Sequence, residues 1–263
     1  MLRGLYTAAS GMYAQQRKTD IITNNMANIH TPGFKEDQTT IRAFPEMLLK
    51  RMGTTSNGAS VESNPIGTLN TGVYVQEILP RLIQGDLEQT ERLTDLALTD
   101  SGTGTSFFTV QAGDDVKYTR NGSLTLDPQG LLTTGQGWPL LDVNGEVIRL
   151  TSDQFTVTSQ GIIEENGNEV AQLGIIVAEN PEALIKESDG LYKTENNEPL
   201  PLAENAAAYQ ISQGFIEKST VDPMRAMTDL MTAYRAFEAN QKILQAYDRS
   251  LDKTVNEVGR VNG

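Results

Sequence analysis

The sequence predicts an α+β fold in which helices at the two ends of the chain form a coiled-coil-like module and an antiparallel all-β domain is inserted between them. Apolar residues recur every three or four positions over residues 2–29 and every seven positions over residues 222–260, which indicates the two helices. Residues 69–216 consist of short apolar runs separated by turn-forming pairs, which indicates the inserted β domain.

The first predicted helix covers residues 2–29 and stops at a sharp turn. Its apolar stripe passes through Leu5, Met12 and Ile22, and the segment Thr31-Pro32-Gly33 follows it. Proline pushes the residue before it out of the helical backbone region, and a Pro-Gly pair suits a type II turn. A helix of this length with one apolar stripe needs a partner that covers the stripe.

A segment of mixed character separates this helix from the β-rich region. The pair Phe44-Pro45 breaks it, and residues 46–51 are predicted to form one or two helical turns. Residues 53–68 are rich in Gly, Ser, Thr and Asn, which is typical of a linker. The predicted organisation is therefore an N-terminal helix and turn, a linker, a β-rich central domain and a C-terminal helix, over residues 1–52, 53–68, 69–216 and 217–263.

The central region has the pattern of a series of short strands and hairpins. Residues 116–126 are the clearest hairpin, because apolar alternation flanks Asn121-Gly122, a pair that favours a type I′ turn. The evenly spaced Asn-Gly and Asp-Gly pairs are interpreted as a meander of hairpins and not as a true repeat. Strands are expected at residues 73–78, 107–110 and 175–178, further turns at 144–145, 166–167 and 189–190, and a short helix at 181–186.

The C-terminal heptads are the strongest periodic signal in the chain. Asp222 suits a helix N-cap, and Pro223 stands where a first-turn proline is tolerated. A helix over residues 222–260 would be roughly 58 Å long, so we expect the N-terminal helix to be its partner. The heptad positions are Leu230, Phe237, Leu244, Leu251 and Val258, with Met227, Tyr234, Gln241, Asp248 and Val255 at the second seam position.

The charge of the chain is concentrated in its middle. The 263 residues carry a formal net charge of −13. Residues 53–218 hold 8 Lys and Arg against 24 Asp and Glu, a net charge of −16, whereas residues 1–52 carry +3 and residues 219–263 carry none. No basic stripe is available for a phosphate backbone, so binding to nucleic acid is disfavoured.

The sequence offers no residue set that predicts catalysis, a metal site or a bound cofactor. Cysteine is absent, and His30 is the single histidine and has no apparent partner. No run of 18 apolar residues predicts a membrane span, and the opening residues lack the apolar core of a cleavable signal peptide. We therefore expect no cofactor, no nucleic-acid partner and no membrane insertion.

Two other functional classes compete with a structural role. One is an enzyme of the β-rich domain that acts on carbohydrate through two carboxylates, although nothing marks one acidic pair and Trp138 is the only tryptophan for sugar stacking. Turnover of peptidoglycan or polysaccharide would support it. The other is a cytosolic coiled-coil adaptor, which would remain inside the cell.

Three groups of motifs resemble the flagellar axial family of rod, hook and hook-associated proteins. The N-terminal group is Ser10-Gly11-Met12, Asn24-Asn25-Met26-Ala27-Asn28 and Thr31-Pro32-Gly33-Phe34-Lys35. The central group is Phe107-Phe108-Thr109-Val110 and Tyr118-Thr119-Arg120-Asn121-Gly122, similar to the distal- and proximal-rod branch. The C-terminal group is Ile216-Glu217-Lys218-Ser219-Thr220-Val221-Asp222 and Tyr234-Arg235-Ala236-Phe237-Glu238-Ala239-Asn240-Gln241-Lys242.

The resemblance covers nearly the whole chain, and the opening residues are most similar to distal-rod-like paralogues of Gram-positive bacteria. Thr220, Tyr234 and Phe237 depart from the family's usual Asn, Gln and Tyr. Thr103-Gly104-Thr105-Ser106 also departs from its usual Gly-x-Gly. These departures bear on which position in the rod the chain would occupy.

The resemblance implies a structural subunit of the flagellar basal-body rod, with a hook or hook-associated protein as the alternative. Such a subunit is exported by the flagellar type III machinery without a cleaved signal and polymerises helically outside the cytoplasmic membrane. Its partners would be copies of itself, other axial subunits and the export machinery. The assembly interface is expected at Leu5, Met12, Ile22, Asn25, Met26, Asn28, Ile29, Thr31, Pro32, Gly33, Phe34, Met227, Leu230, Tyr234, Phe237, Asn240, Leu244, Leu251, Val255 and Val258.

Overall fold

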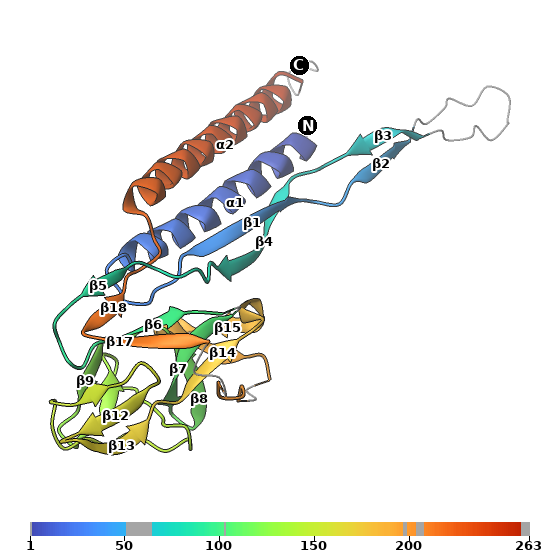
Figure 1. Cartoon of the computed structure of the whole chain (residues 1–263). Helices are drawn as coiled ribbons and strands as arrows, with labels where there is room; N and C mark the ends of the chain where they lie inside the picture. Colours follow the sequence, from blue (N-terminus) through green and yellow to red (C-terminus); the bar gives the residue numbers. More distant parts are fainter. Residues whose placement is uncertain (1, 51–64, 103, 197–198, 204–207, 259–263) are drawn as a thin grey trace. The chain divides into compact units, whose positions relative to one another are not determined.

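A computed structural model describes residues 2–50, 65–102, 104–196, 199–203 and 208–258 (Figure 1). The chain forms two compact units. We call the first the helical unit; it comprises residues 1–24, 38–78 and 224–263. The second, the β unit, comprises residues 25–37 and 79–223. Both ends of the chain thus enter the helical unit, and the β unit is built mainly from the middle.

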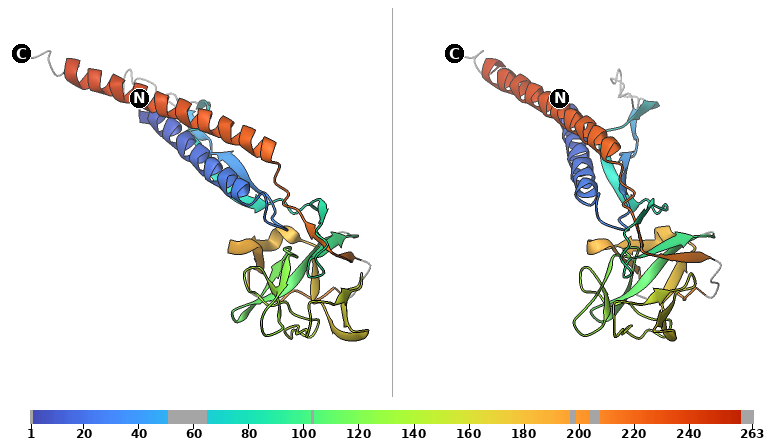
Figure 2. Two further views of the ribbon diagram at one scale, coloured as in Figure 1. Left: turned by 90° about the vertical axis from the view of Figure 1, so that its left-hand side faces the viewer. Right: turned by 60° about the vertical axis from the view of Figure 1, so that its left-hand side comes forward.

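The two helices that the periodicity predicts are confirmed. Helix α1 covers Leu2–Ala27, and helix α2 covers Pro223–Val258. They lie side by side in the helical unit, with the N-terminal end of α1 beside the C-terminal half of α2 (Figures 1 and 2). In the described part of the chain, neither helix is both long and apolar enough to cross a membrane.

Small residues let α1 and α2 approach closely. A Cβ atom at Gly4 would meet the hydroxyl group of Tyr247, and a Cβ atom at Gly11 would lie 3.2 Å from Nδ2 of Asn240. The contacts step seven residues forward on α1 and seven back on α2, so the helices are antiparallel. Among the described residues of this unit, four alanines are buried, namely Ala8, Ala14, Ala226 and Ala233.

A ribbon of strands completes the helical unit. Strand β1 (Asp37–Ala43) pairs with β4 (Val73–Pro80), and β2 (Met47–Lys50) pairs with β3 (Pro65–Leu69). Ser10 of α1 accepts a hydrogen bond from the Val73 amide at 3.3 Å, which attaches the ribbon to the helix.

Two predictions fall on this ribbon. The helical turns expected at residues 46–51 are wrong for the described residues, because Met47–Lys50 is a strand that pairs with Pro65–Leu69. Of the predicted linker 53–68, residues 53–64 lie outside the described residues, and its end belongs to β3.

The β unit is antiparallel throughout its described strand pairs. Its largest sheet has five strands in the order β14-β7-β8-β16-β15, and a three-stranded sheet has the order β11-β12-β13. Three two-stranded pairs are β17-β6, β18-β5 and β10-β9. The strands are β5 (Leu87–Gln89), β6 (Leu96–Asp100), β7 (Thr105–Ala112), β8 (Asp115–Thr119), β9 (Leu124–Leu126), β10 (Leu132–Thr134), β11 (Thr156–Val157), β12 (Ile162–Glu165), β13 (Asn168–Gln172), β14 (Ile175–Ala178), β15 (Leu184–Lys186), β16 (Leu191–Thr194), β17 (Tyr209–Gln213) and β18 (Phe215–Glu217).

The apolar core of the β unit lies between these sheets. Its buried side chains come from strands that alternate inward and outward residues and from the loop after β10. The partly buried side chain of Trp138 packs against this core. Residues that are at most 3% exposed in this core include Leu96, Leu98, Phe108, Val110, Leu124, Leu132, Leu140, Ile148, Phe155, Ile163, Leu173 and Ile175.

Most local strand and turn predictions are confirmed. The strands expected at 107–110 and 175–178 belong to β7 and β14, and the one expected at 73–78 belongs to β4. Asn166-Gly167 forms the turn between β12 and β13, with positive φ angles of 53° and 79°. The short helix expected at 181–186 is a single 3-10 turn, η1 (Pro181–Ala183), followed by β15; a second turn, η2 (Ser188–Gly190), joins β15 to β16.

The predicted hairpin at residues 116–126 is wrong. Strand β8 pairs with β7 and β16, whereas β9 pairs with β10. After β8 the chain runs past β6, where the carbonyl of Gly122 accepts the Leu96 amide at 2.9 Å. The two strands thus pair with other strands instead of with each other, and tertiary context overrides the local turn signal of Asn121-Gly122.

Candidate functional site

The segment that follows α1 is bonded, within the β unit, to the segment that precedes α2. The amide of Gly33 donates to the carbonyl of Glu217 at 2.8 Å, and the amide of Thr220 donates to the carbonyl of Phe34 at 3.1 Å. The amide of Arg81 donates to the carbonyl of Glu36 at 2.7 Å. Residues 33–36 therefore lie between two other stretches of backbone, one on each side.

Gly33 is required by the close approach of a third segment. Its φ is +69°, and a Cβ atom there would lie 2.5 Å from the backbone carbonyl group of Arg120. Any side chain would thus be strained in φ and would also collide with main chain. The predicted Pro32-Gly33 turn has its physical explanation here, since it brings the chain against the end of β8.

Arg120 is the centre of a buried ionic cluster. Its Nε donates to Glu217 at 2.6 Å, and its Nη2 donates to Asp100 at 2.9 Å and to Gln84 at 2.7 Å. Its Nη1 donates to Asp100 at 3.0 Å and also to the carbonyl of Ser106. Every nitrogen of the guanidinium group therefore donates to an oxygen of the β unit.

Glu217 connects this guanidinium to the N-terminal segment. One carboxylate oxygen accepts from Arg120, and the other accepts from Nζ of Lys35 at 2.5 Å and from the amide of Gly85 at 2.7 Å. The same Nζ donates to the carbonyl of Ile83 at 2.6 Å. Lys35, Glu217 and Arg120 are respectively 0%, 1% and 2% exposed. We call Lys35, Asp100, Arg120 and Glu217 the ionic junction.

The charges of the ionic junction balance. Two cations, Lys35 and Arg120, face two carboxylates, Asp100 and Glu217. Burial lowers the pKa of the Lys35 ammonium below its ordinary value, and Glu217 opposes that shift. Burial would also lower the pKa of Arg120, but Glu217 and Asp100 outweigh it and raise that pKa.

Lys186 of β15 holds the same segment one step further along the chain. Its Nζ lies 2.8 Å from the carboxylate of Asp37, donates to the carbonyl of Lys35 at 2.9 Å and stands 3.9 Å from the centre of the Phe34 ring. The side chain of Asn25 holds the segment at Asp37, because it exchanges hydrogen bonds with the backbone of that residue at 2.9 and 3.0 Å.

The ionic junction is arranged to connect segments. The carboxylate oxygens of Glu217 and the nitrogens of Lys35 and Arg120 are occupied by one another and by backbone. A buried pair of this kind, with its hydrogen bonds satisfied, mainly specifies how segments fit together.

The structure distributes the predicted interface residues over three environments. Ile22, Asn25, Gly33 and Phe34 are buried; the last three are in the β unit, where the side chain of Asn25 is bonded to the backbone of Asp37. Met227, Tyr234 and Val255 are exposed, and the side chain of Val258 lies outside the described part. Intermediate exposure is found for Leu5, Met12, Met26, Asn28, Ile29, Thr31, Pro32, Leu230, Phe237, Asn240, Leu244 and Leu251.

The ionic junction was not predicted from the sequence, although three of its four residues stand in the motifs. Lys35 closes the Thr-Pro-Gly-Phe-Lys motif, Arg120 is in Tyr-Thr-Arg-Asn-Gly, and Glu217 is in Ile-Glu-Lys-Ser. Each of the three resembling motifs contributes one charged residue. The signal was a single charge inside each motif, but only the fold shows that the three charges meet.

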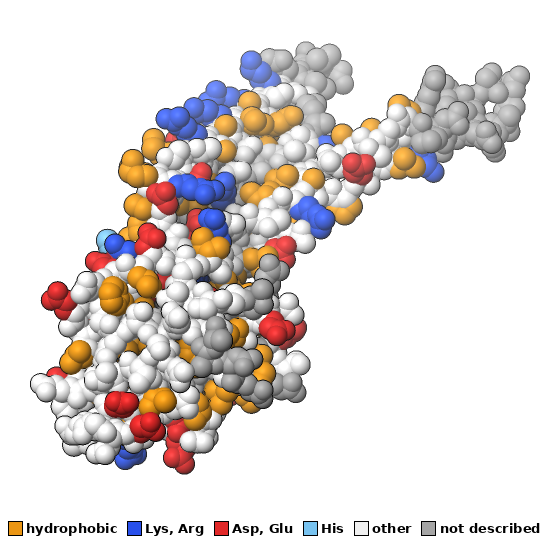
Figure 3. Space-filling view, viewed as in Figure 1, with side chains coloured by type: hydrophobic (Ala, Val, Ile, Leu, Met, Phe, Trp, Pro, Cys, Tyr) orange, Lys and Arg blue, Asp and Glu red, His pale blue; other side chains and the backbone are white. Residues whose placement is uncertain are grey.

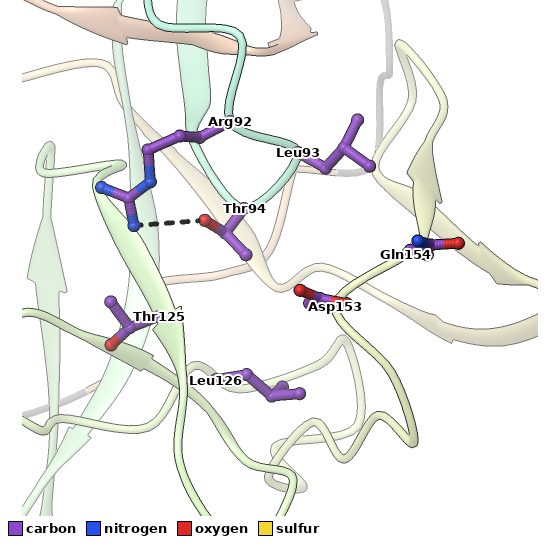
Figure 4. A pocket seen from close by; sticks show the side chains of 7 residues that line it. All are labelled: Arg92, Leu93, Thr94, Thr125, Leu126, Asp153 and Gln154. Carbon is purple, nitrogen blue, oxygen red and sulfur yellow. Dashed lines mark hydrogen bonds between the residues drawn. The ribbon is translucent and has the colours of Figure 1, made fainter.

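The described part of the β unit also contains pockets. Figure 4 shows one of about 490 Å³, lined by Arg92, Leu93, Thr94, Thr125, Leu126, Asp153 and Gln154. Nη2 of Arg92 lies 3.5 Å from the hydroxyl of Thr94. Asp153 is the single carboxylate of this lining, whereas Glu187 and Asp189 both line a second pocket, of about 530 Å³, together with Trp138. Among the described residues, no group of three His, Cys, Asp or Glu side chains is placed to hold a metal ion.

The fold and the junction define a class of chain: a scaffold whose two ends pair as helices and whose β domain is inserted between them. Three family models match this chain. The model described as flagella basal body rod protein matches residues 5–35. The flagellar hook protein FlgE/F/G D1 domain matches residues 103–165, and the flagellar basal body rod FlgEFG protein C-terminal model matches residues 212–257.

Full-length relatives agree with these matches. The flagellar hook-basal body complex protein FlhO of Bacillus subtilis is 41% identical over 272 residues, which cover 99% of this chain and 100% of the relative. The flagellar basal-body rod protein FlgG of the same organism is 32% identical and covers 97% of this chain and 99% of the relative. The rod protein FlgF of Caulobacter vibrioides is 30% identical, with 100% of both chains covered. The chain belongs to the flagellar basal-body rod protein family, as its motifs predict.

Proposed function

We propose that this chain is a structural subunit that polymerises helically into the torque-transmitting rod of the flagellum. Its membership of the rod protein family supports the site of action. The observation that carries the proposal is an exposed apolar stripe on α2: Met224, Met227, Met231 and Tyr234 are 77%, 56%, 50% and 56% exposed. Hydrophobic side chains along this helix are visible on the surface in Figure 3.

The stripe lies on the face of α2 that is turned away from α1. Its members are three or four residues apart, so they share one side of the helix. The partly buried heptad residues Leu230, Phe237 and Leu244 occupy a different side, together with the contact residues Asn240 and Tyr247. α2 therefore has an apolar face beyond the one that packs on α1, and a neighbouring subunit would cover it.

A coiled-coil-like assembly module made of several copies follows from this arrangement. Head-to-tail contacts between different faces produce an open filament when they do not close into a ring. The terminal regions 1–52 and 217–263 would supply the contacts, and the acidic central region 69–216 would stand outside them. The partners are copies of this chain and other axial subunits.

Export by the flagellar type III machinery, without a cleaved signal, is the second part of the proposal. The absence of cysteine in the sequence suits a chain that is threaded unfolded and then folds outside the cytoplasmic membrane. The family resemblance of the N-terminal motifs supports the same route.

Deletion of residues 224–263 tests the assembly role. It removes α2 after its first residue but leaves the β unit intact, including Glu217 and Thr220. We expect Trp138 fluorescence to report a folded β unit, while incorporation into basal bodies and motility are lost. Motile cells that carry only the truncated chain would contradict the proposal.

A hook or hook-associated role is the second candidate, because the model that matches residues 103–165 bears the name of a hook protein domain. Imaging of purified hook–basal bodies with a labelled copy separates the two. Label in the rod supports the first candidate, and label in the hook supports the second.

A further inference from the structure

We infer that Lys35 is a positioning residue: together with Arg120 and Glu217 it fixes the segment that leaves α1 beside the segment that enters α2. The three residues come from the three stretches that the family models match, 5–35, 103–165 and 212–257. They meet in one buried cluster of the β unit. Nothing about the chain's polymerisation is needed for this inference.

The two halves of the junction differ in origin. Arg120 is held by Asp100, Gln84 and Ser106, which all belong to the central part of the chain. That half uses no residue of either terminal segment. Glu217 then brings the C-terminal segment to Arg120 at 2.6 Å.

Lys35 supplies the other half. Its ammonium reaches the second oxygen of Glu217 and the carbonyl of Ile83, so it bridges the C-terminal segment and the residues before β5. The neighbouring backbone bonds, Gly33 to Glu217 and Thr220 to Phe34, flank this bridge. Without the ammonium, a buried carboxylate faces one cation fewer, and both backbone bonds lie beside an unfilled space.

We call this bridge the lock, because it holds residues 33–36 beside residues 217–220. Residues 33–36 belong to no strand. They are held by isolated backbone bonds, by the Lys35 side chain, by the bond from the Glu36 amide to the Thr220 hydroxyl, and by Lys186, which donates to the Lys35 carbonyl. Isolated backbone bonds to loops open easily unless a buried side chain holds them. Lys35 is the only side chain of residues 33–36 that reaches Glu217 among the bonds and ion pairs described.

A distance measurement on the full-length chain tests the lock. The sequence has no cysteine, so spin labels can be placed at His30→Cys and Lys218→Cys, both exposed and on the two segments in question. We expect a single narrow distance distribution in the otherwise unchanged chain. Lys35→Met should broaden it, while Trp138 fluorescence remains that of a folded β unit.

Matched variants separate positioning from general stability. Lys193→Met removes a partly exposed lysine whose partner Glu187 lies in the same unit, and it should leave the distribution narrow. Lys35→Arg keeps a cation at the junction and should restore most of the narrow population. A narrow distribution in Lys35→Met would overturn the inference.

Hydrogen exchange on the unmodified chain keeps the inference testable if Lys35→Met does not fold. The amides of Gly33 and Thr220 should exchange as slowly as those of the core strand β7, because the lock holds both backbone bonds closed. Exchange of these two amides at the rate of an exposed loop would overturn it.

Discussion

The ammonium nitrogen of Lys35 lies 2.5 Å from a carboxylate oxygen of Glu217, although 182 residues separate the two in the sequence. This ion pair is buried and joins the segments that adjoin the two helices. Arg120 donates to the second carboxylate oxygen of Glu217, and the carbonyl of Ile83 accepts a further hydrogen bond from Lys35. The contribution of this ion pair to the stability of the β unit can be measured by substitution.

Glu217→Gln should strongly destabilise the β unit. The substitution leaves Lys35 and Arg120 buried with Asp100 as the only carboxylate of the junction, and an uncompensated buried charge costs about 3 to 5 kcal/mol. Urea denaturation followed by the fluorescence of Trp138 would give the loss. Glu88→Gln is the control, since its pair with Lys218 is exposed, and it should change stability by less than about 0.5 kcal/mol.

Gly33→Ala should lower the free energy of unfolding more than the same substitution at a glycine that has the same φ and open space around it. Both Gly33 and Gly113 have φ near +70°, but a Cβ atom at Gly113 meets nothing within 4 Å. We expect about 1 kcal/mol for Gly113→Ala from backbone strain, and about 2 to 4 kcal/mol for Gly33→Ala, where the collision with Arg120 backbone adds to it. Equal shifts in the urea midpoint would contradict the close approach.

Gly11→Leu should separate α1 from α2. Leucine favours a helix by about 1 kcal/mol over glycine, so α1 itself is not weakened. The added side chain must instead displace Asn240, whose Nδ2 lies 3.2 Å from the Cβ position. Thermal melting followed by far-ultraviolet circular dichroism should show earlier loss of helix. Tyr13→Leu, at an exposed position of the same helix, should leave melting unchanged.

The sequence determines the helices of this chain more clearly than their surfaces. Heptad spacing and the Pro-Gly stop are local signals, and α1 and α2 follow them closely. The same spacing could not show which side is covered: Leu230 and Phe237 are partly buried, whereas Met227 and Tyr234 are exposed. That difference depends on where α1 lies, which no local pattern contains.

In the β unit, too, local sequence patterns do not determine which strands pair. Asn121-Gly122 has the composition of a hairpin turn, but β8 pairs with β7 and β16, and Tyr118 of β8 is buried in one cluster with Phe107 and Tyr192 of these strands. Arg120, placed by that pairing, then turns into the protein and meets two carboxylates. Charged side chains are mostly exposed, so the composition of this motif alone predicts an exposed Arg120. The junction could therefore not be found without the fold.

Acid should remove a small contribution to stability that comes from Glu187. Hydrogen bonds from Lys117 and then Lys193 lower the pKa of its carboxyl group below the ordinary 4.5. A carboxyl group with a lowered pKa stabilises the folded state above the unfolded value, and the contribution is lost as the pH falls through the folded value. The difference in urea midpoint between the parent and Glu187→Gln should therefore shrink as the pH falls below the ordinary pKa of 4.5. A difference that grows toward low pH would contradict the assignment.

Met227→Asp should block assembly without unfolding the monomer. Met227 is 56% exposed in the centre of the α2 stripe, so the isolated chain tolerates a charge there. In the proposed rod the same position is covered by a neighbouring subunit, and an unpaired buried carboxylate would disfavour the contact. We expect unchanged thermal melting of the purified chain together with loss of motility and of incorporation into basal bodies. Val170→Asp places the same charge on a comparably exposed apolar residue of the β unit and should leave motility intact. Normal rods built from Met227→Asp chains would show that this face of α2 is not an interface.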